Sequence, residues 1–392
     1  MAQGRRLRIG ATLIALALVV AACGSDKKTT TSSGSSSSKP EATIAFVGPL
    51  TGPNSPNLGI NIRNGAKTAV EEYNAKADSK YKITLKEIDT QGDPAQAVTV
   101  KDQYINDTSI LGIIGPAFSG ETKAVIPSLD EAGLVMISAS ATNTLLPTIV
   151  PNTKVFHRVI ADDAFQGKGI GDYIVDTLKS KTIVVIDDSS EYGKGLAADT
   201  IKEITAKGGT IAKALEIPDP KAQDFSAQVN DAKAANPDVI MYAGYYDAAG
   251  RLRKQLTDAG VKSGFISGDG SLDPGFVTSA SASAGEGALL SCPCNLAVEA
   301  SPGKLGEFYK SYKAVNNAEP GTYSPEAYDV ANIFIKGIEA GNTDRAKLLS
   351  FVNSLGTYEG ISKTIEFVSN GNIKTPSLYV FEVKAGKLVP KV

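Results

Sequence analysis

The sequence contains few of the residues on which enzymes most often depend. Of its 392 residues only one is a histidine and three are cysteines. A serine triad needs a base, and His157 is the only histidine that could serve. It falls in the predicted strand Val155–Ile160, where a lone histidine is more often packed structure than a catalyst, and the sequence has no Gly-x-Ser-x-Gly elbow. An exported hydrolase is therefore the less favoured interpretation.

Cysteine is too scarce for a structural zinc site. Cys23 belongs to the N-terminal leader, which leaves Cys292 and Cys294 with no second Cys/His pair to complete a ligand set. In an exported protein a Cys-Pro-Cys pair can close a small disulfide. We expect that bond, with two free thiols in a loop as the alternative. We expect no metal and no cofactor.

An excess of positive charge is also lacking. The chain has 40 lysines and arginines against 42 aspartates and glutamates. Its first 22 residues contain three arginines and no acidic residue, so their removal leaves 37 basic and 42 acidic residues, a net charge of about −5. A protein that binds nucleic acid needs a basic surface to neutralise phosphates. Nucleic acid is therefore not an expected partner.

No hydrophobic run is long enough for a reliable membrane span. Arg8 and two earlier arginines precede an apolar run from Ile9 to Ala22, a pattern that predicts an export signal over residues 1–22. Cys23 follows two small residues directly. The pattern resembles a bacterial lipoprotein signal, in which cleavage precedes the cysteine and a lipid on that cysteine anchors the chain at the outer face of the cell membrane. The alternative is a plain secretory peptide that ends near a cysteine.

The remaining chain is long enough for two domains. Residues 23–40 are rich in serine and threonine and predict a flexible, lipidated tether. About 350 residues follow, which exceeds the usual size of one hydrophobic core.

Short Val- and Ile-rich runs alternate with helical patterns in two successive copies. This alternation is typical of parallel sheets covered by helices on both faces, so the sequence predicts an α/β fold with two doubly wound parallel-sheet domains. The copies also share residues, since Asp93-Pro94-Ala-Gln is echoed by Asp219-Pro220-Lys-Ala-Gln. The predicted strands are Thr43–Val47, Ile83–Ile88, Ile110–Ile114 and Leu134–Ile137 in the first copy, and Thr182–Ile186, Ile211–Ile217, Val239–Tyr242 and Gly264–Ile266 in the second. The predicted helices are Asn61–Ala75, Asp93–Tyr104, one that begins at Gly120, Tyr192–Lys207, Phe225–Ala234 and Ala248–Ala259.

Two features interrupt this regular pattern. Pro127 is expected to kink or shorten the helix that begins at Gly120. The glycines in Gly167-x-Gly169-x-Gly171 have the wrong spacing for a nucleotide loop and sit in a helical pattern, so we expect them to allow close packing.

Beyond Ala288 the alternation ends. Leu305–Lys313 and Ala327–Ala340 are predicted helices, and Thr364–Val368 and Leu378–Val383 are predicted strands. Such segments can pack on either domain, which allows the chain to cross between the domains more than once.

The loops that follow the predicted strands form the candidate site, because ligands of open parallel sheets bind outside the carboxyl ends of the strands. In the first copy, Ser119 precedes a helix whose N-terminal N–H groups suit a carboxylate. Ser140 and Thr142 can add hydroxyl donors. The alternative is that Ser119 is only an N-cap. The loops that follow the predicted strands of the two copies are Gly48–Asn57, Gly115–Glu121, Ser138–Asn143, Asp187–Gly193, Gly244–Asp247 and Ser267–Ser271.

The second copy offers the opposite charge. Asp269 lies between two glycines, and Tyr192 and Tyr245 follow strands of the same copy. The alternatives are an ordinary turn residue and tyrosines that only pack. Together the two copies present an anion site and a cation site with aromatic hydroxyls, which is the complement of a small zwitterion.

Several motifs resemble the branched-chain amino-acid binding proteins of ABC transporters, and the similarity covers about residues 42–385. The resemblance implies a type I periplasmic binding-protein fold, in which a three-crossing hinge joins the two domains. It also implies that Ser119, Ser140 and Thr142 hold the ligand carboxylate. Asp269 with Tyr192 and Tyr245 would hold the ammonium, and Tyr323 would contact the ligand side chain. The motifs are Ile44–Gly52, Asp89–Ala97, Ile114–Ser119, Val135–Thr142, Tyr192–Gly195 and Gly244-Tyr245.

The chain departs from the leucine–isoleucine–valine-binding members at several positions. Those members have a glutamate where this chain has Asp269, and often an aromatic residue near the position of Leu58. They also have a disulfide in the first domain where this chain has Gly92 and Phe118. Relatives with this fold also bind amides, urea and aromatic acids, so the side chain of the ligand is the open question.

We therefore expect a solute receptor that captures an amino acid or a related zwitterion between two lobes and delivers it to an ABC permease. The expected lobes are residues 41–160 with 293–365, and residues 161–292 with 366–392. We expect a monomer, held outside the cell membrane by a lipid on Cys23. The alternatives are a sensor of the same fold for an amide or an aromatic acid, and the exported hydrolase.

Overall fold

The computed structural model describes residues 39–53 and 55–391. The export signal, the tether and the lipidation of Cys23 therefore lie outside the described residues. Within the described part of the chain, no helix combines the length and the apolar character that a membrane crossing requires.

The first sheet contains five parallel strands in the order β2-β1-β3-β4-β5. The inner strands β3 and β4 are buried at every position, including all five residues of the Ile-Leu-Gly-Ile-Ile run in β3, whereas the edge strand β2 is partly exposed. A strand that is apolar on both faces must be covered by helices on both faces. The strands are β1 (Glu41–Gly48), β2 (Lys82–Asp89), β3 (Ile110–Ile114), β4 (Val135–Ser138) and β5 (Phe156–Arg158).

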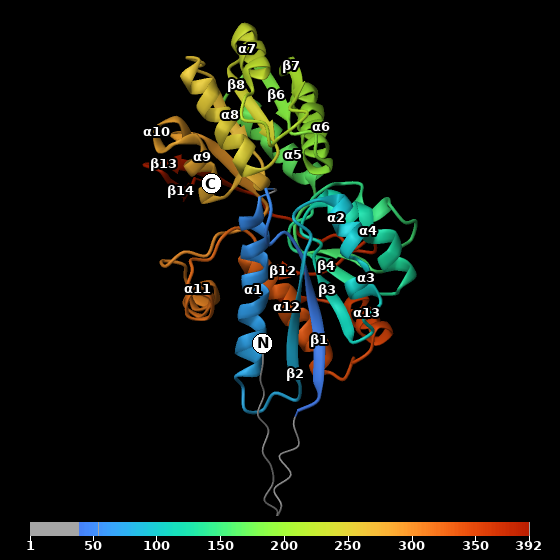
Figure 1. Ribbon diagram of the computed structural model, residues 1–392. Helices are drawn as coiled ribbons and strands as arrows, with labels where there is room; N and C mark the ends of the chain where they lie inside the picture. Colours follow the sequence, from blue (N-terminus) through green and yellow to red (C-terminus); the bar gives the residue numbers. More distant parts are fainter. Residues whose placement is uncertain (1–38, 54, 392) are drawn as a thin grey trace, which may run out of the picture. The chain divides into compact units, whose positions relative to one another are not determined.

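Helices from both ends of the chain cover this sheet. Alternate side chains of β1 divide between the two faces: Ile44 and Phe46 pack with residues of α1 and α12, whereas Ala45 and Val47 pack with residues of α2 and α4. Figure 1 shows α1 and α12 side by side, although they are far apart in the sequence. The helices are α1 (Pro56–Asn74), α2 (Pro94–Val100), α3 (Asp102–Ile105), α4 (Ser119–Glu131), α11 (Gly303–Asn316), α12 (Ser324–Glu339) and α13 (Arg345–Asn353).

The second sheet contains seven strands in the order β14-β13-β10-β9-β8-β6-β7. Five of them are parallel, and the hairpin β13-β14 adds an antiparallel edge on β10. The strands are β6 (Thr182–Asp187), β7 (Thr210–Glu216), β8 (Val239–Ala243), β9 (Gly264–Ser267), β10 (Leu289–Cys292), β13 (Tyr379–Lys384) and β14 (Lys387–Pro390). The helices that accompany it are α5 (Asp163–Asp172), α6 (Glu191–Ala206), α7 (Ser226–Ala235), α8 (Tyr246–Asp258), α9 (Pro274–Ala280) and α10 (Ala282–Gly285).

The described chain passes between the elements of the two sheets three times. It leaves the first sheet after β5, returns to it after β10, and enters the second sheet again at β13. A small hairpin of β11 (Tyr358–Glu359) and β12 (Thr364–Ile365) precedes the last passage. Cys292 and Cys294 form a disulfide at the second passage. The predicted architecture of two helix-covered parallel sheets is confirmed.

Some local predictions differ from the structure. The sequence pattern missed β10, β11, β14, α9, α10 and α13, and the predicted strand Thr364–Val368 is a strand only over Thr364–Ile365. The strand β10 reads Leu-Leu-Ser-Cys rather than as a Val/Ile run, and its burial comes from neighbours that join it on both sides. Pro127 does not end α4, which continues to Glu131.

The glycines of α5 permit close packing, as predicted. A Cβ atom on Gly167 would approach Thr200 N to 2.8 Å, and one on Gly171 would approach the Cβ of Glu203 to 2.8 Å. Real Cβ contacts are almost never so short, so these positions let α5 lie directly against α6.

Candidate functional site

A small cavity lies where loops from the two sheets meet. Its volume is about 10 Å³, roughly the space that one water molecule needs. All the predicted ligand residues except Thr142 line it, together with two residues that the sequence did not single out, Phe118 and Gly270. The lining residues are Leu58, Phe118, Ser119, Ser140, Tyr192, Tyr245, Asp269, Gly270 and Tyr323.

Hydroxyl groups line the wall on the side of the first sheet. Ser119 is the first residue of α4, and its side chain is buried. Its Oγ accepts a hydrogen bond from the main-chain N–H of Asn143 at 3.2 Å. Ser140 follows β4, and its Oγ donates to the carbonyl of Ala117 at 2.5 Å. The N-terminus of a 13-residue helix and the Ser119 hydroxyl thus face the cavity, an arrangement that suits a carboxylate, and the Ser140 hydroxyl lines the same wall with its proton donated to Ala117.

Glu121 supports this wall from behind. Its carboxylate accepts from the main-chain N–H of Phe118 at 2.9 Å and from the hydroxyl of Thr90. The side chain is fully buried, and this burial raises its pKa to about 7. The residue before α4 is therefore hydrogen-bonded to a carboxyl group whose pKa is near neutral.

A buried carboxylate forms the opposite wall. Asp269 follows β9, is 2% exposed, and accepts from the Tyr192 hydroxyl at 2.7 Å and from the Tyr323 hydroxyl. The Tyr192 oxygen also accepts from Gly270 N at 3.1 Å. Burial raises the pKa of Asp269, and the two tyrosine hydrogen bonds oppose that rise. A carboxylate has about four lone-pair directions, so Asp269 keeps acceptor capacity for an ammonium group.

Three aromatic rings contact one another in series, at tilted angles, beside this carboxylate. The ring centroids of Phe118 and Tyr245 are 4.5 Å apart, and those of Tyr245 and Tyr192 are 5.3 Å apart. Leu58, from α1, and Tyr323 add further apolar surface. The cavity therefore combines one end that suits an anion, one end that suits a cation and an apolar remainder.

Thr142 lies outside the lining of this cavity. Its carbonyl accepts from Asp163 N at 2.8 Å, and its buried hydroxyl interacts with the buried carboxylate of Asp163. Burial and the nearby charge of Asp269 raise the pKa of Asp163 well above its usual range. The sequence did not single out Asp163, although it is an acidic residue just after a predicted strand.

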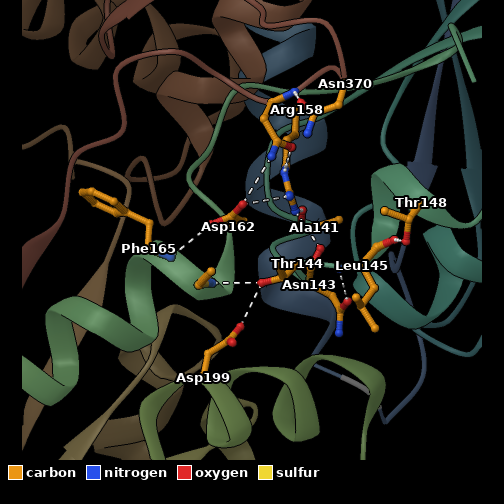
Figure 2. A network of polar contacts seen from close by, with 12 residues as sticks. Ala141, Asn143, Thr144, Leu145, Thr148, Arg158, Asp162, Phe165, Asp199 and Asn370 are labelled. Atoms are coloured by element: carbon orange, nitrogen blue, oxygen red, sulfur yellow. Dashed lines mark hydrogen bonds and ion pairs between the residues drawn. The ribbon is translucent and has the colours of Figure 1, made fainter. Parts of the chain in front are cut away.

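A fully buried guanidinium holds the loop that carries Ser140 and Thr142. Arg158 donates from Nη1 to the carbonyls of Ala141 and Asn143, at 3.2 and 2.9 Å, as Figure 2 shows. Its Nε donates to Asn372 Oδ1 at 2.8 Å, and its Nη2 lies 3.5 Å from the carboxylate of Asp162. One side chain therefore ties this loop to two of the segments that pass between the sheets.

Direct contacts also join the elements of the two sheets near the cavity. Asn143 Nδ2 donates to the carbonyl of Glu191 at 2.8 Å, and Lys123 forms an ion pair with the Glu191 carboxylate at 2.7 Å. Thr144 donates to Asp199 at 2.9 Å, a contact also visible in Figure 2. These bonds form only while the elements around the first sheet lie against the elements around the second sheet.

His157 is not brought together with the hydroxyls of the cavity. It lies in β5 and lines a different cavity, and its ring contacts the tilted ring of Phe367, with centroids 4.8 Å apart. Burial lowers its pKa to about 4, so that it stays neutral at physiological pH. Among the residues that the structure describes, no cluster of three or more His, Cys, Asp or Glu side chains is arranged to hold a metal ion.

Known proteins resemble this chain over most of its length. The model of a family described as periplasmic binding protein matches residues 41–387. The chain is 30% identical over 352 residues to Leu/Ile/Val-binding protein homolog 3 of Brucella melitensis, which covers 89% of this chain and 93% of that protein. It is 30% identical over 343 residues to the leucine-, isoleucine-, valine-, threonine-, and alanine-binding protein of Pseudomonas aeruginosa, with coverages of 86% and 89%.

A solved structure shares the fold at somewhat lower identity. The branched-chain amino acid transporter substrate binding protein LivJ of Streptococcus pneumoniae, solved in complex with isoleucine, aligns with a TM-score of 0.80. The alignment has 26% sequence identity and covers 90% of this chain and 99% of that chain.

Proposed function

The chain belongs to the periplasmic binding-protein family, and on that premise we propose that it is an extracytoplasmic receptor for a small α-amino acid. The receptor closes two lobes around the ligand and delivers it to an ABC permease. The lobes are residues 41–160 with 293–365, and residues 161–292 with 366–392. Relatives named for leucine, isoleucine and valine support the branched-chain class of ligand.

The observation that carries this proposal is the opposite polarity of the two walls of one cavity. Ser119 and Ser140 offer hydroxyls beside a helix N-terminus, and Asp269 offers a buried carboxylate. An α-amino acid carries a carboxylate and an ammonium on one carbon atom, so it can satisfy both walls at once. We assign the carboxylate to Ser119, Ser140 and the loop with Thr142, and the ammonium to Asp269 with Tyr192 and Tyr245.

Closure of the lobes follows from where the contacts lie. Tyr323, at the start of α12, donates to Asp269 after β9, so this bond joins elements of the two sheets across the cavity. Because the cavity holds only about 10 Å³ in this arrangement, an amino acid enters only after the walls move apart. A ligand that contacts both walls then favours the closed state over the open one, which is the basis of a hinge-type receptor.

The membrane attachment is a further part of the proposal. Cys23 at the end of the export signal is its lipidated anchor, and residues 23–40 are the tether. The tether keeps the receptor near the permease and raises its effective concentration there. A Cys23→Ala variant should move the protein from the membrane fraction into the soluble extracytoplasmic fraction. Retention in the membrane fraction would contradict the anchor.

Calorimetry on the purified receptor tests the ligand class. Leucine, isoleucine, valine and alanine are titrated beside leucinamide, which lacks the carboxylate, and N-acetyl-leucine, which lacks the ammonium. Tight binding of at least one free amino acid and weak binding of both blocked analogues is the expected result. Benzoate and a simple amide are included as competitors, since binding of either without any free amino acid would refute the proposal. Recovery of the ligand unchanged after incubation checks that the protein binds without catalysis.

A further inference from the structure

The turn before α12 bonds to the second sheet through two consecutive side chains. The Thr322 hydroxyl donates to the carbonyl of Leu272, and the Tyr323 hydroxyl donates to the carboxylate of Asp269. Thr322 and Tyr323 lie in the segment that leads into α12, which covers the first sheet. Asp269 and Leu272 follow β9 of the second sheet. Both bonds therefore join one lobe to the other.

Of these two side chains, one lines the ligand cavity and one does not. Tyr323 is part of the lining, whereas Thr322 lies outside it. Thr322 is 1% exposed and Leu272 is 0% exposed, so in this arrangement water has no access to the bond between them. The Thr322 hydroxyl therefore satisfies a buried carbonyl of the opposite lobe without touching the space for the ligand.

The conformation of this turn is fixed from within its own lobe. Ser324 N donates to the carbonyl of Gly321 at 3.1 Å, and Gly321 N donates to Ser324 Oγ at 3.1 Å. A Cβ atom on Gly321 would approach Asn61 Nδ2 to 2.2 Å, so the glycine lets the turn lie directly on α1. Tyr323 has a φ of 69°, in the left-handed region that residues other than glycine rarely adopt. These constraints hold the Thr322 hydroxyl toward the second lobe.

The Leu272 carbonyl has different surroundings in the two states of a hinged receptor. When the lobes separate, Thr322 and Leu272 move apart and water can bond both groups. When the lobes close, the Thr322 hydroxyl replaces that water. Without the hydroxyl, closure would bury the carbonyl with no donor, and the open state would not carry this penalty. The penalty therefore acts on the equilibrium between open and closed receptor more than on folding.

We propose that Thr322 is a positioning residue that stabilises the closed receptor without contacting the ligand. The measured affinity of a hinged receptor includes the free energy of closure, so the bond to Leu272 contributes to the affinity for any ligand that closes the lobes. The same bond raises the closed fraction of the ligand-free receptor. This inference rests on the proposed two-lobed function and adds to it a residue outside the ligand cavity.

Thr322→Val tests the bond, because valine has nearly the shape of threonine and lacks the hydroxyl. Affinity for the best amino-acid ligand should fall by at least ~5-fold, the loss expected when a buried carbonyl has no donor. In stopped-flow measurements the loss should appear as faster dissociation, with the association rate little changed. Thr322→Ser keeps the hydroxyl and should restore most of the affinity.

Thr68→Val is the matched control. The Thr68 hydroxyl is also buried and donates to a main-chain carbonyl, that of Asn64 at 2.8 Å, but both residues lie in α1. The Thr68 oxygen accepts from Asn316 of α11, which belongs to the same lobe. Thr68→Val should therefore lower the thermal stability and leave the affinity at the wild-type value. Thr322→Val should change the affinity more than the thermal stability of the ligand-free receptor.

A second measurement needs no ligand. Lys123 and Glu191 form an ion pair between the lobes in the closed arrangement. In a receptor with Lys123→Cys and Glu191→Cys, a short bifunctional thiol reagent joins the two positions when the lobes are closed. Adding Thr322→Val should slow this trapping by at least ~5-fold in the absence of ligand. Adding Thr68→Val should leave the trapping rate unchanged.

The outcomes separate the role of Thr322 from the proposed function. Trapping and dissociation at wild-type rates in Thr322→Val would overturn the inference, and so would equal changes in Thr68→Val. A wild-type receptor that binds no free amino acid contradicts the proposed function, and the trapping rates then decide the role of Thr322 by themselves. If Thr322→Val loses its cooperative thermal transition, Thr322→Ala replaces it with the same expected slowing.

Discussion

The two walls of the ligand cavity achieve opposite polarity by different means. On the first wall, Ser119 and Ser140 are neutral, and their hydroxyls are bonded to the main chain of nearby loops. On the second wall, Asp269 carries the charge itself and is held by two tyrosine hydroxyls. One wall therefore depends on the position of a loop and a helix end, and the other on a single ionised group. Removing the charge should cost far more than removing any one hydroxyl.

The strongest test of this difference is Asp269→Ala. Removing one partner of a buried, hydrogen-bonded charge pair costs about 2–5 kcal/mol of binding free energy. Affinity for the best amino-acid ligand should fall by at least ~30-fold, measured by calorimetry. Thermal stability without ligand should be unchanged or higher, because burial already raises the pKa of Asp269 and disfavours its charge. Asp269→Glu serves as the control that keeps the charge, and unchanged affinity in Asp269→Ala would remove this residue from the site.

A second test concerns the carboxyl group behind the first wall. The pKa of Glu121 is about 7 in the folded protein, against an ordinary value of 4.5. Between these pH values the folded state binds a proton that the unfolded state has released, so the contribution of Glu121 to stability falls as pH rises. The wild-type free energy of unfolding, taken relative to Glu121→Gln, should decrease by up to about 3 kcal/mol between pH 4.5 and pH 7.

Urea unfolding at several pH values measures this difference. Glu131→Gln, at the other end of the same helix, is the control, because the Glu131 side chain is exposed. Its pH profile should follow that of the wild type. A difference between wild type and Glu121→Gln that rises with pH would reverse the predicted sign and show that Glu121 is stabilised as a carboxylate.

Arg158→Lys tests whether the first wall depends on the position of the loop that carries Ser140 and Thr142. A lysine keeps the charge but cannot bond two carbonyls and a side-chain amide in the planar geometry of a guanidinium. Loss of the bonds to Ala141 and Asn143 should lower the free energy of unfolding by about 2 kcal/mol. Amino-acid affinity should fall as well, since the same loop carries Ser140.

Arg345 provides a matched control for this variant. It also bonds main-chain carbonyls with its guanidinium, among them those of Ile110 and Ile105 at 2.9 and 3.0 Å, but it does not line the ligand cavity. Arg345→Lys should therefore lower stability by a similar amount while affinity stays at the wild-type value. Equal losses of affinity in both variants would show that Arg158 acts through general stability and has no positioning role.

The smallest expected effect is that of Ser140→Ala. A neutral hydrogen bond contributes about 1 kcal/mol, so affinity should fall by about fivefold, with other donors still facing the ligand carboxylate. Calorimetry with the same ligand as for Asp269→Ala allows direct comparison. A loss as large as that of Asp269→Ala would mean that the two walls do not differ in the way their construction suggests.

Much of the fold could be predicted because most of its helices and strands have a recognisable local sequence pattern. Val- and Ile-rich runs alternate with helical patterns, and nearly every strand of the two parallel cores was predicted in this way. Among the missed elements, the strands β10 and β14 lack that signature. They are strands because they form hydrogen bonds with neighbouring strands. The sequence of a short segment does not indicate which strands will lie beside it.

The sequence by itself determined which loops lie together at the cavity, since loops after parallel strands share one edge of a sheet. It thereby brought Ser119, Ser140 and Asp269 into consideration. Only the tertiary structure decided which side chains meet. Tyr323 donates a hydrogen bond to Asp269, which lies 54 positions earlier in the sequence. The Phe118 ring contacts the Tyr245 ring, and Arg158 donates a hydrogen bond to the loop that carries Ser140. The reason is that hydrophobic periodicity specifies each element locally, whereas contacts between elements depend on how the chain passes from one sheet to the other and back.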